Sequence, residues 1–196
     1  MSEWWTYRPA SFLMFSARTW GRLLEDWNRE LWPLQPAFVL AGAALVVMAA
    51  RPPVQSAPWI TGTLALAWAW VGWAFHWQRF ADINTGAPWF AVAFALQAVL
   101  LLALGTGRSA SPPSPRMRIA GLGLAALAVL AYPLAAPLAG RDWAQAEVAG
   151  AMPTPTALLT VGLVLASALR RRAWLLAIPV LALVVGWGTD LLLATR

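Results

Sequence analysis

Charged residues are scarce in this sequence, and none of them is a lysine. Charged side chains make up 11% of the 196 residues and hydrophobic ones 60%, whereas about a quarter of a soluble domain is charged. Because so few polar side chains cannot cover a water-facing surface, we expect lipid to be the solvent for most of the chain. The net charge of +6 comes from arginines spread between apolar runs rather than gathered in a soluble domain, which excludes nucleic acid as the partner.

Cysteine is absent as well, which excludes disulfides, thiolate metal sites and a cysteine nucleophile. His76 is the only histidine, so a second histidine for a catalytic triad is missing. The sequence also contains no Gly-rich phosphate loop and no nucleophile elbow. We therefore expect a protein that is not an enzyme and that binds no cofactor.

A metal or haem site would need further ligands beside His76. The side chains expected near the same face of the protein are Met152, Asp82, Asp142, Glu147 and Asp190. No two of these residues show a ligand spacing such as H-x-x-x-H. We predict no metal, and a site built on His76 and Met152 stays an alternative without positive evidence.

Six apolar segments are long enough, or nearly so, to cross the bilayer as helices, which takes roughly 20 residues each. They are continuously apolar and rich in Ala and Leu, and they lack the alternation of barrel strands. The sequence predicts an all-α bundle of about six transmembrane helices, at residues 31–50, 57–78, 86–105, 118–139, 154–170 and 173–194. The fifth is the shortest, and we expect its last turn to reach Arg170, whose long side chain extends to the interface.

The connections between these segments alternate between two faces. Face B comprises the loops 51–58, 105–118 and 170–172, with seven arginines and no acid. Face A comprises the N-terminal tail, the loops 79–87 and 140–153 and the C-terminus, with the other seven arginines and all eight acids. Arginines crowded into short loops at helix ends are typical of the cytoplasmic side. We predict a bacterial inner-membrane protein with face B in the cytoplasm and both termini outside.

The N-terminal tail contains an amphipathic helix. From a cap at Ser16 onward, the stretch ARTWGRLLEDWNRELW gathers apolar side chains on one helical stripe and charged ones largely on the other side. The stripe consists of Trp20, Leu23, Leu24, Trp27 and Leu31. We predict an interfacial helix on face A within residues 1–30, ahead of a transmembrane domain over residues 31–196; a flank without function is the alternative.

The fourteen tryptophans include two groups with different expected roles. One group lies near predicted helix ends, where amphipathic indoles anchor in the headgroup layer: Trp32, Trp59, Trp89, Trp143 and Trp174. The other group, Trp68, Trp70, Trp73 and Trp77, runs through the second segment toward His76. These side chains are expected to face lipid or fill a helix interface, with a binding site as the alternative.

His76 lies where the second apolar segment ends at face A. On a helix it shares a face with Gly72, Trp73 and Phe80, and the glycine would let another helix approach closely beside the imidazole. Polar groups at membrane depth usually have a partner or a task. His76 is therefore expected to make a structural hydrogen bond to a headgroup or loop carbonyl, or else to handle a proton or a ligand.

Other polar residues converge on face A. The segment AMPTPTALLT starts the fifth helix and offers threonine hydroxyls, and Asp190 lies near the same end of the sixth. Gln97 is the only strongly polar side chain near mid-membrane and is expected to make an interhelical hydrogen bond. The candidate ligand-binding, proton-handling or docking residues are His76, Arg79, Asp82, Asn84, Trp73, Trp77, Thr154, Thr156 and Asp190. They predict a shallow pocket or docking surface open to the outside.

Four stretches together resemble a known family. They are EDWNRELWP before the first segment, FHWQRFADIN after the second, AYPL in the fourth and PTPTALLTVGL at the start of the fifth. They are similar to domain-of-unknown-function family 6064, in the same order and at similar spacing over essentially the whole chain. The resemblance implies a bacterial multi-helix inner-membrane protein without an assigned activity.

The residues that match the motifs of this family have no known roles. They are Asn28, Trp32, Pro33, His76, Trp77, Asn84, Pro153, Pro155 and Thr156. Members tend to carry a cysteine where this chain has Thr154. A His–Cys metal site is therefore not expected in this protein.

Three functional hypotheses follow. The leading one is a non-enzymatic integral membrane protein, either an accessory subunit of a membrane complex or a small-ligand binder, with lipid and further membrane subunits as partners. The second is a transporter or channel for a small solute or proton that uses His76, Asp82 and Asp190. The third is a membrane haem or metal-linked redox protein.

Overall fold

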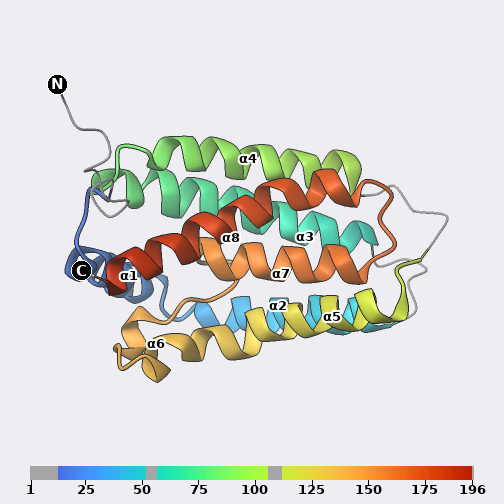
Figure 1. Cartoon of the computed structure of the whole chain (residues 1–196), viewed down its shortest axis with the longest axis horizontal. Helices are drawn as coiled ribbons and strands as arrows, with labels where there is room; N and C mark the ends of the chain where they lie inside the picture. Colours follow the sequence, from blue (N-terminus) through green and yellow to red (C-terminus); the bar gives the residue numbers. More distant parts are fainter. Residues whose placement is uncertain (1–12, 52–56, 106–111, 196) are drawn as a thin grey trace.

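The computed structural model describes residues 13–51, 57–105 and 112–195, and within these ranges the fold is all-α (Figure 1). Helical segments occupy all six regions expected from the apolar runs. They are α2 (Gln35–Ala50), α3 (Ala57–Trp70) with η3 (Val71–Trp77), α4 (Ala87–Leu104), α5 (Pro115–Ala126) with η5 (Leu127–Ala131), η6 (Tyr132–Leu134) and α6 (Ala135–Leu138), α7 (Pro153–Ala166) and α8 (Arg172–Ala194).

Among the described residues, three of these stretches are both long and apolar enough to cross a membrane: Ala87–Leu104, Pro115–Leu138 and Arg172–Ala194. A fourth span results if α2 is counted together with α1 (Ala17–Leu31), from which it is bent by 88°. The apolar α7 has only 14 residues. It ends at Ala166 rather than reaching Arg170 as expected, because the backbone turns extended at Ser167.

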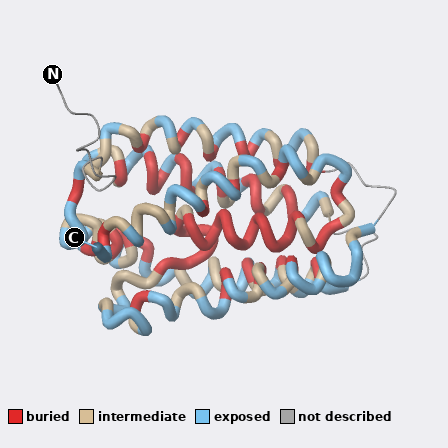
Figure 2. The backbone as a smooth tube through the Cα atoms, in the orientation of Figure 1, coloured by how far each residue is buried: buried red, intermediate tan, exposed pale blue. Residues whose placement is uncertain are grey.

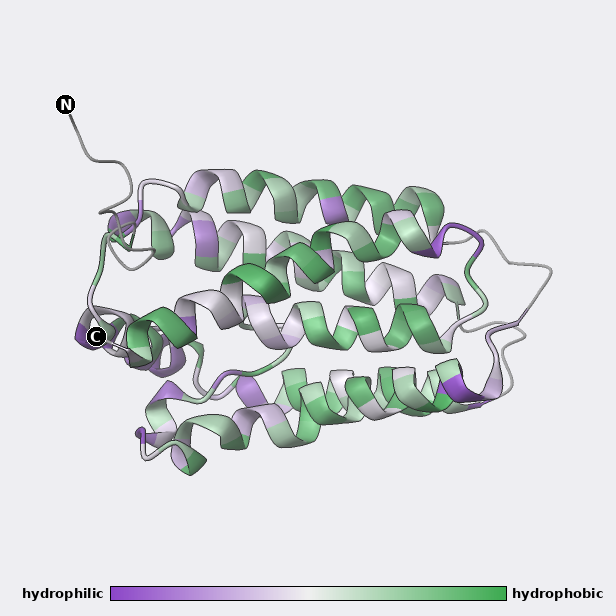
Figure 3. Ribbon diagram, in the orientation of Figure 1, coloured by the Kyte–Doolittle hydropathy of each residue, from purple (hydrophilic) through white to green (hydrophobic). Residues whose placement is uncertain are grey.

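The elongated helices lie side by side and are connected at two opposite ends (Figure 1). The C-terminus, α1 and α6 lie at one end, together with the start of α4 and of α7. The starts of α3, α5 and α8 lie at the other end. Hydropathic colouring is green along the helices, and much of the purple lies toward the two ends (Figure 3). The elements expected at face A and those expected at face B therefore lie at opposite ends of the bundle.

Helix α7 forms the centre of the bundle and is buried along nearly its whole length (Figure 2). It packs mainly against α5 and α8. Thr156 and Thr160 donate to carbonyls one turn earlier, and the Thr160 hydroxyl also accepts the indole N–H of Trp68 at 2.8 Å. Trp68 is fully buried, so it fills a helix interface, one of the two structural roles expected for it.

Helix α1 begins at the expected cap: the Ser16 hydroxyl accepts the backbone N–H of Thr19 at 3.1 Å. Its apolar stripe faces the rest of the chain, since Leu24, Trp27 and Leu31 are buried. The indole N–H of Trp27 donates to the carbonyl of Ala151 at 3.2 Å. Three of the five residues of the stripe are thus covered by protein, while Trp20 and Leu23 are half-buried.

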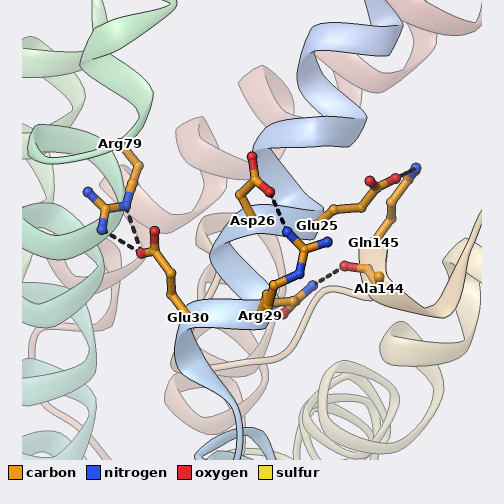
Figure 4. Close-up of polar contacts among 8 residues, drawn as sticks. Glu25, Asp26, Arg29, Glu30, Arg79, Ala144 and Gln145 are labelled. Carbon is orange, nitrogen blue, oxygen red and sulfur yellow. Dashed lines mark hydrogen bonds and ion pairs between the residues drawn. The ribbon is translucent and has the colours of Figure 1, made fainter.

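Polar contacts fix α1 on both sides across the face A end (Figure 4). The Arg79 guanidinium binds the Glu30 carboxylate, with Nε 3.0 Å from the oxygen. Glu25 accepts from the side-chain amide of Gln145 at 2.8 Å. Asn28 donates to two carbonyls of the 140–153 connection. Helix α1 therefore links the end of η3 to this connection.

Two stretches depart from α-helical geometry in a way that the apolar pattern does not reveal. Both η3 and η5 are π-helical, with wider turns than an α-helix. The second of these precedes Pro133, which has no N–H to donate to the preceding turn. The first contains His76, and π-helical turns are frequent at functional sites.

Helices α5 and α7 touch through glycines. A Cβ on Gly121 would lie 2.6 Å from the carbonyl oxygen of Gly162 and 2.7 Å from the backbone nitrogen of Ala166. Both neighbours are backbone atoms and cannot rotate away. The close approach of the two helices therefore depends on the missing side chain.

We expect Gly121→Ala to lower the free energy of unfolding by about 1–3 kcal/mol, because the new methyl group forces α5 away from α7. Gly123→Ala is the matched control, since a Cβ there meets nothing within 4 Å. Thermal unfolding of both variants in detergent provides the measurement. Equal midpoints for the two variants would contradict this packing.

Candidate functional site

A cavity of about 340 Å³ lies at the face A end, between η3, α4, α7 and α8. Leu13, Phe15 and Trp20, from the segment before α1 and its start, close part of it, as does Glu147 of the 140–153 connection. The wall is mostly aromatic and aliphatic. The polar side chains that line it are His76, Asn84, Glu147, Thr154, Thr189 and Asp190.

The oblique course of α8 creates this space (Figure 1). Helices α4 and α8 meet where the Gln97 amide donates to the carbonyl of Leu175 at 3.0 Å, the interhelical bond that the sequence predicted. From there α8 crosses the bundle away from α4 toward the face A end. The two helices therefore diverge around the cavity, which begins beyond their polar contact.

Two glycines bring the other walls together. A Cβ on Gly72 would lie 2.9 Å from Cβ of Phe94, so η3 touches α4 beside the imidazole as expected. A Cβ on Gly186 would lie 2.5 Å from the hydroxyl oxygen of Thr154. Helix α8 is thereby held against the first turn of α7, and Thr154 is fixed at the cavity edge.

His76 is buried, with 5% of its surface exposed, and lines the cavity. Neither ring nitrogen has a hydrogen-bond partner among the described residues. Phenylalanine rings surround the imidazole, with the centroid of Phe94 at 4.5 Å and that of Phe90 at 5.7 Å. The expected bond to a loop carbonyl is therefore not made within the described ranges, and the imidazole beside the cavity has no polar partner there.

Glu147 is the second unusual polar group: it is 5% exposed and also lines the cavity. Burial and, to a smaller extent, the Asp190 carboxylate raise the pKa of the Glu147 carboxyl to about 8, against the opposing effect of Arg141. Within the described part of the chain, neither acid forms an ion pair. The two carboxyls thus form an acidic pole that faces the cavity.

The remaining polar lining residues are held in place by local contacts. Thr154 follows Pro153 at the start of α7, and the hydroxyl of Tyr132 lies beside it. The Asn84 side-chain oxygen accepts the backbone N–H of Gly86 at 2.8 Å, which shapes the turn before α4. Both side chains border the cavity from fixed backbone positions.

The structure brings together four of the candidate residues: His76, Asn84, Thr154 and Asp190. The other five do not line the cavity. Asp82 is exposed and Arg79 pairs with Glu30. Trp73 and Trp77 stack on each other on the outer surface, 59% and 48% exposed.

Thr156 is occupied structurally. Its hydroxyl accepts the N–H of Gly150 at 2.7 Å and donates to the carbonyl of Met152. Met152 is fully buried and does not line the cavity. No cluster of three or more His, Cys, Asp or Glu residues that could hold a metal occurs in the described ranges.

Sequence reasoning missed Glu147 as a site residue and considered it only as a metal ligand. The signal was weak, because an acid in a loop next to other polar residues is usually solvated. Its burial follows from the way α1 and α7 enclose the 140–153 connection, which no local pattern encodes.

Residues 18–195 match the model of a family of unknown function, DUF6064. The match covers nearly the whole chain and includes every wall of the cavity except Leu13 and Phe15. The chain therefore belongs to this family, as its motifs indicated. No curated protein and no solved structure matches it.

We expect His76→Leu to stabilise the empty protein by about 1–2 kcal/mol, because a buried polar group without a partner is removed and the volume is nearly kept. A histidine with a structural hydrogen bond would give the opposite sign. Thr160→Val serves as the control, since it breaks the formed bond to Trp68 and should destabilise. Thermal unfolding in detergent distinguishes the two cases.

The raised pKa of Glu147 predicts a loss of stability with increasing pH. The unfolded carboxyl ionises near pH 4.5, whereas the folded one stays neutral up to about pH 8. Unfolding therefore releases a proton between these values, and stability falls by up to about 1.4 kcal/mol per pH unit.

Thermal midpoints from pH 5 to pH 9 test this dependence. Glu147→Gln should flatten the decrease, while the exposed Asp82→Asn should leave it unchanged. A decrease of the same slope in Glu147→Gln would mean that other groups carry it; those facing Glu147 are Tyr132, Asp190, Arg141 and, across the cavity, His76.

Proposed function

We propose that this protein is an integral membrane protein whose six helical segments span a bacterial inner membrane and whose face A end binds a small, mainly apolar ligand. The cavity with its unpartnered His76 is the observation that carries the ligand-binding role. Of the two non-enzymatic roles expected from the sequence, it favours ligand binding over that of an accessory subunit.

Surface composition supports the membrane part of the proposal. Large apolar side chains are exposed along the outside of the bundle, such as Leu102 at 60% and Leu181 at 61%. In water an apolar surface of this extent would be unfavourable, whereas in lipid it is the expected exterior.

Tryptophans support the same arrangement. The five that were expected as anchors at helix ends are all exposed, from 63% for Trp143 to 76% for Trp89. Indoles in the headgroup layer keep their rings in contact with lipid and their N–H groups with water. With the arginine-rich face B in the cytoplasm, the cavity would lie toward the outer leaflet.

Cavity shape and composition support the ligand. Ligand sites are mostly apolar spaces of about 300–1,000 Å³ with a few convergent polar groups. The volume here lies within this range, and five phenylalanines line the wall: Phe15, Phe75, Phe80, Phe90 and Phe94. A small molecule with a hydrocarbon or aromatic body would fit this wall, and a polar group on it could bond to the His76 imidazole.

Octan-1-ol is a suitable probe, because it has an apolar body and one hydrogen-bonding group. With the protein in lipid nanodiscs, octanol at ten times its dissociation constant should raise the midpoint of thermal unfolding by about 3–5 °C. Ala182→Phe fills the cavity, where Ala182 forms part of the lining, and should abolish the rise.

Ala177→Phe is the matched control on the same helix, because Ala177 is exposed and does not line the cavity. It should respond to octanol like the unchanged protein. Identical responses of Ala182→Phe and Ala177→Phe would disprove the proposed ligand site.

A further inference from the structure

Acidic and basic side chains are unequally represented in the cavity lining. Two carboxyl groups, Glu147 and Asp190, line it, and the described residues that line it include no arginine. Arg141 is the cation whose field reaches both acids, but no ion pair joins it to either of them among the described residues. Inside the cavity the acids therefore outnumber the cations.

An anionic ligand such as a fatty acid is poorly suited to this pole. A carboxylate there would be placed among two further acids with no cation in the described lining to pair with it. A cation would be attracted for the same reason, and it would supply the hydrogen-bond donors that the unpaired carboxyls lack.

The aromatic part of the cavity lining fits an apolar body. Aromatic rings enclose His76, with Phe75 at 5.5 Å and Phe80 at 5.9 Å between ring centroids. Aromatic faces also attract cations within about 6 Å of the ring, so a phenylalanine-lined wall is compatible with a cationic ligand. The imidazole adds one donor and one acceptor among otherwise apolar rings.

The cavity reaches the outer surface of the bundle. Leu181 and Val185 line it, yet 61% and 39% of their surfaces are exposed. Both residues belong to α8, which diverges from α4 toward the face A end. In a membrane this opening faces lipid, so a molecule dissolved in the outer leaflet could enter sideways.

From these observations we infer that the ligand is an amphipathic amine: its ammonium group binds between Glu147 and Asp190, and its apolar body lies among the phenylalanines beside His76. The inference rests on the proposed ligand-binding function and adds the charge of the ligand. It assigns Glu147 and Asp190 as the residues that determine specificity.

Three probes of equal chain length separate charge from hydrophobicity: octylamine, octan-1-ol and octanoate. In nanodiscs of uncharged phosphatidylcholine, octylamine should stabilise the protein at a concentration at least tenfold lower than octanol. Octanoate should not stabilise it. Uncharged lipid keeps the amine from collecting at the membrane surface.

Variants that remove the charge of a side chain but keep its size show which residues cause the preference for the amine. Glu147→Gln and Asp190→Asn should each reduce the preference for octylamine over octanol at least several-fold while leaving the octanol response in place. Asp82→Asn, exposed at the same end of the bundle, is the control and should keep the full preference.

The pH gives an independent readout. Since the Glu147 carboxyl is neutral up to about pH 8, it must release a proton to pair with an ammonium group. Octylamine binding should therefore strengthen from pH 6 to pH 8, whereas octanol binding should not. Tyr132, Asp190, Arg141 and His76 face the same space, so the dependence must vanish in Glu147→Gln to be assigned to this residue.

The outcomes separate the two proposals. Equal stabilisation by octylamine and octanol, unchanged in Glu147→Gln and Asp190→Asn, would overturn the inference and leave the ligand-binding function standing. Stabilisation by octanoate alone would also overturn it. Failure of all three probes, or equal responses in Ala182→Phe, would remove the ligand-binding function itself.

Discussion

The burial of α7 on all sides is the constraint on which the remaining architecture depends. This helix has 14 residues and is surrounded by its neighbours along almost its full length (Figure 2). Contact with α5 requires glycine at positions 121 and 162, because the backbones touch there. Contact with α3 is polar, through the hydrogen bond from Trp68 to Thr160. A central helix this short fixes the neighbours in one arrangement.

The cavity is a consequence of that arrangement. Helix α8 must cover α7 along its whole course, and Gly186 holds it against Thr154 at the face A end. It can therefore stay beside α4 only at the other end, where Gln97 and Leu175 meet. The space left between the diverging helices is lined by residues of α4, α7 and α8 together with η3.

Much of this could be predicted from the sequence wherever the signal was local. The apolar runs located the six helical segments, Ser16 marked the start of α1, and Gln97 and Gly72 have the interhelical contacts expected of them. The position of His76 at the end of the second segment also drew attention to the correct region. Periodicity, capping and composition act over a few residues, so they can be read directly.

The rest depends on contacts between distant segments. The cavity unites Glu147 with His76, 71 positions apart in the chain, and no spacing rule connects them. The apolar stripe of α1 was predicted correctly, but the sequence pattern does not tell whether protein or lipid covers the stripe. Asp82 and Arg79 lie close to His76 in sequence and yet outside the cavity, because the chain turns at η4 (Phe80–Asp82).

The direction in which the His76 imidazole points depends on the π-helical geometry of η3. Such a turn accommodates one residue more than an α-helical turn, and each residue of a regular helix rotates the following side chains by about 100°. The π-turn therefore absorbs an extra residue without rotating the side chains that follow it, whereas the same residues wound as an ordinary α-helix would turn the ring away from its aromatic surroundings. The orientation of the only histidine thus depends on the number of residues in each turn of η3.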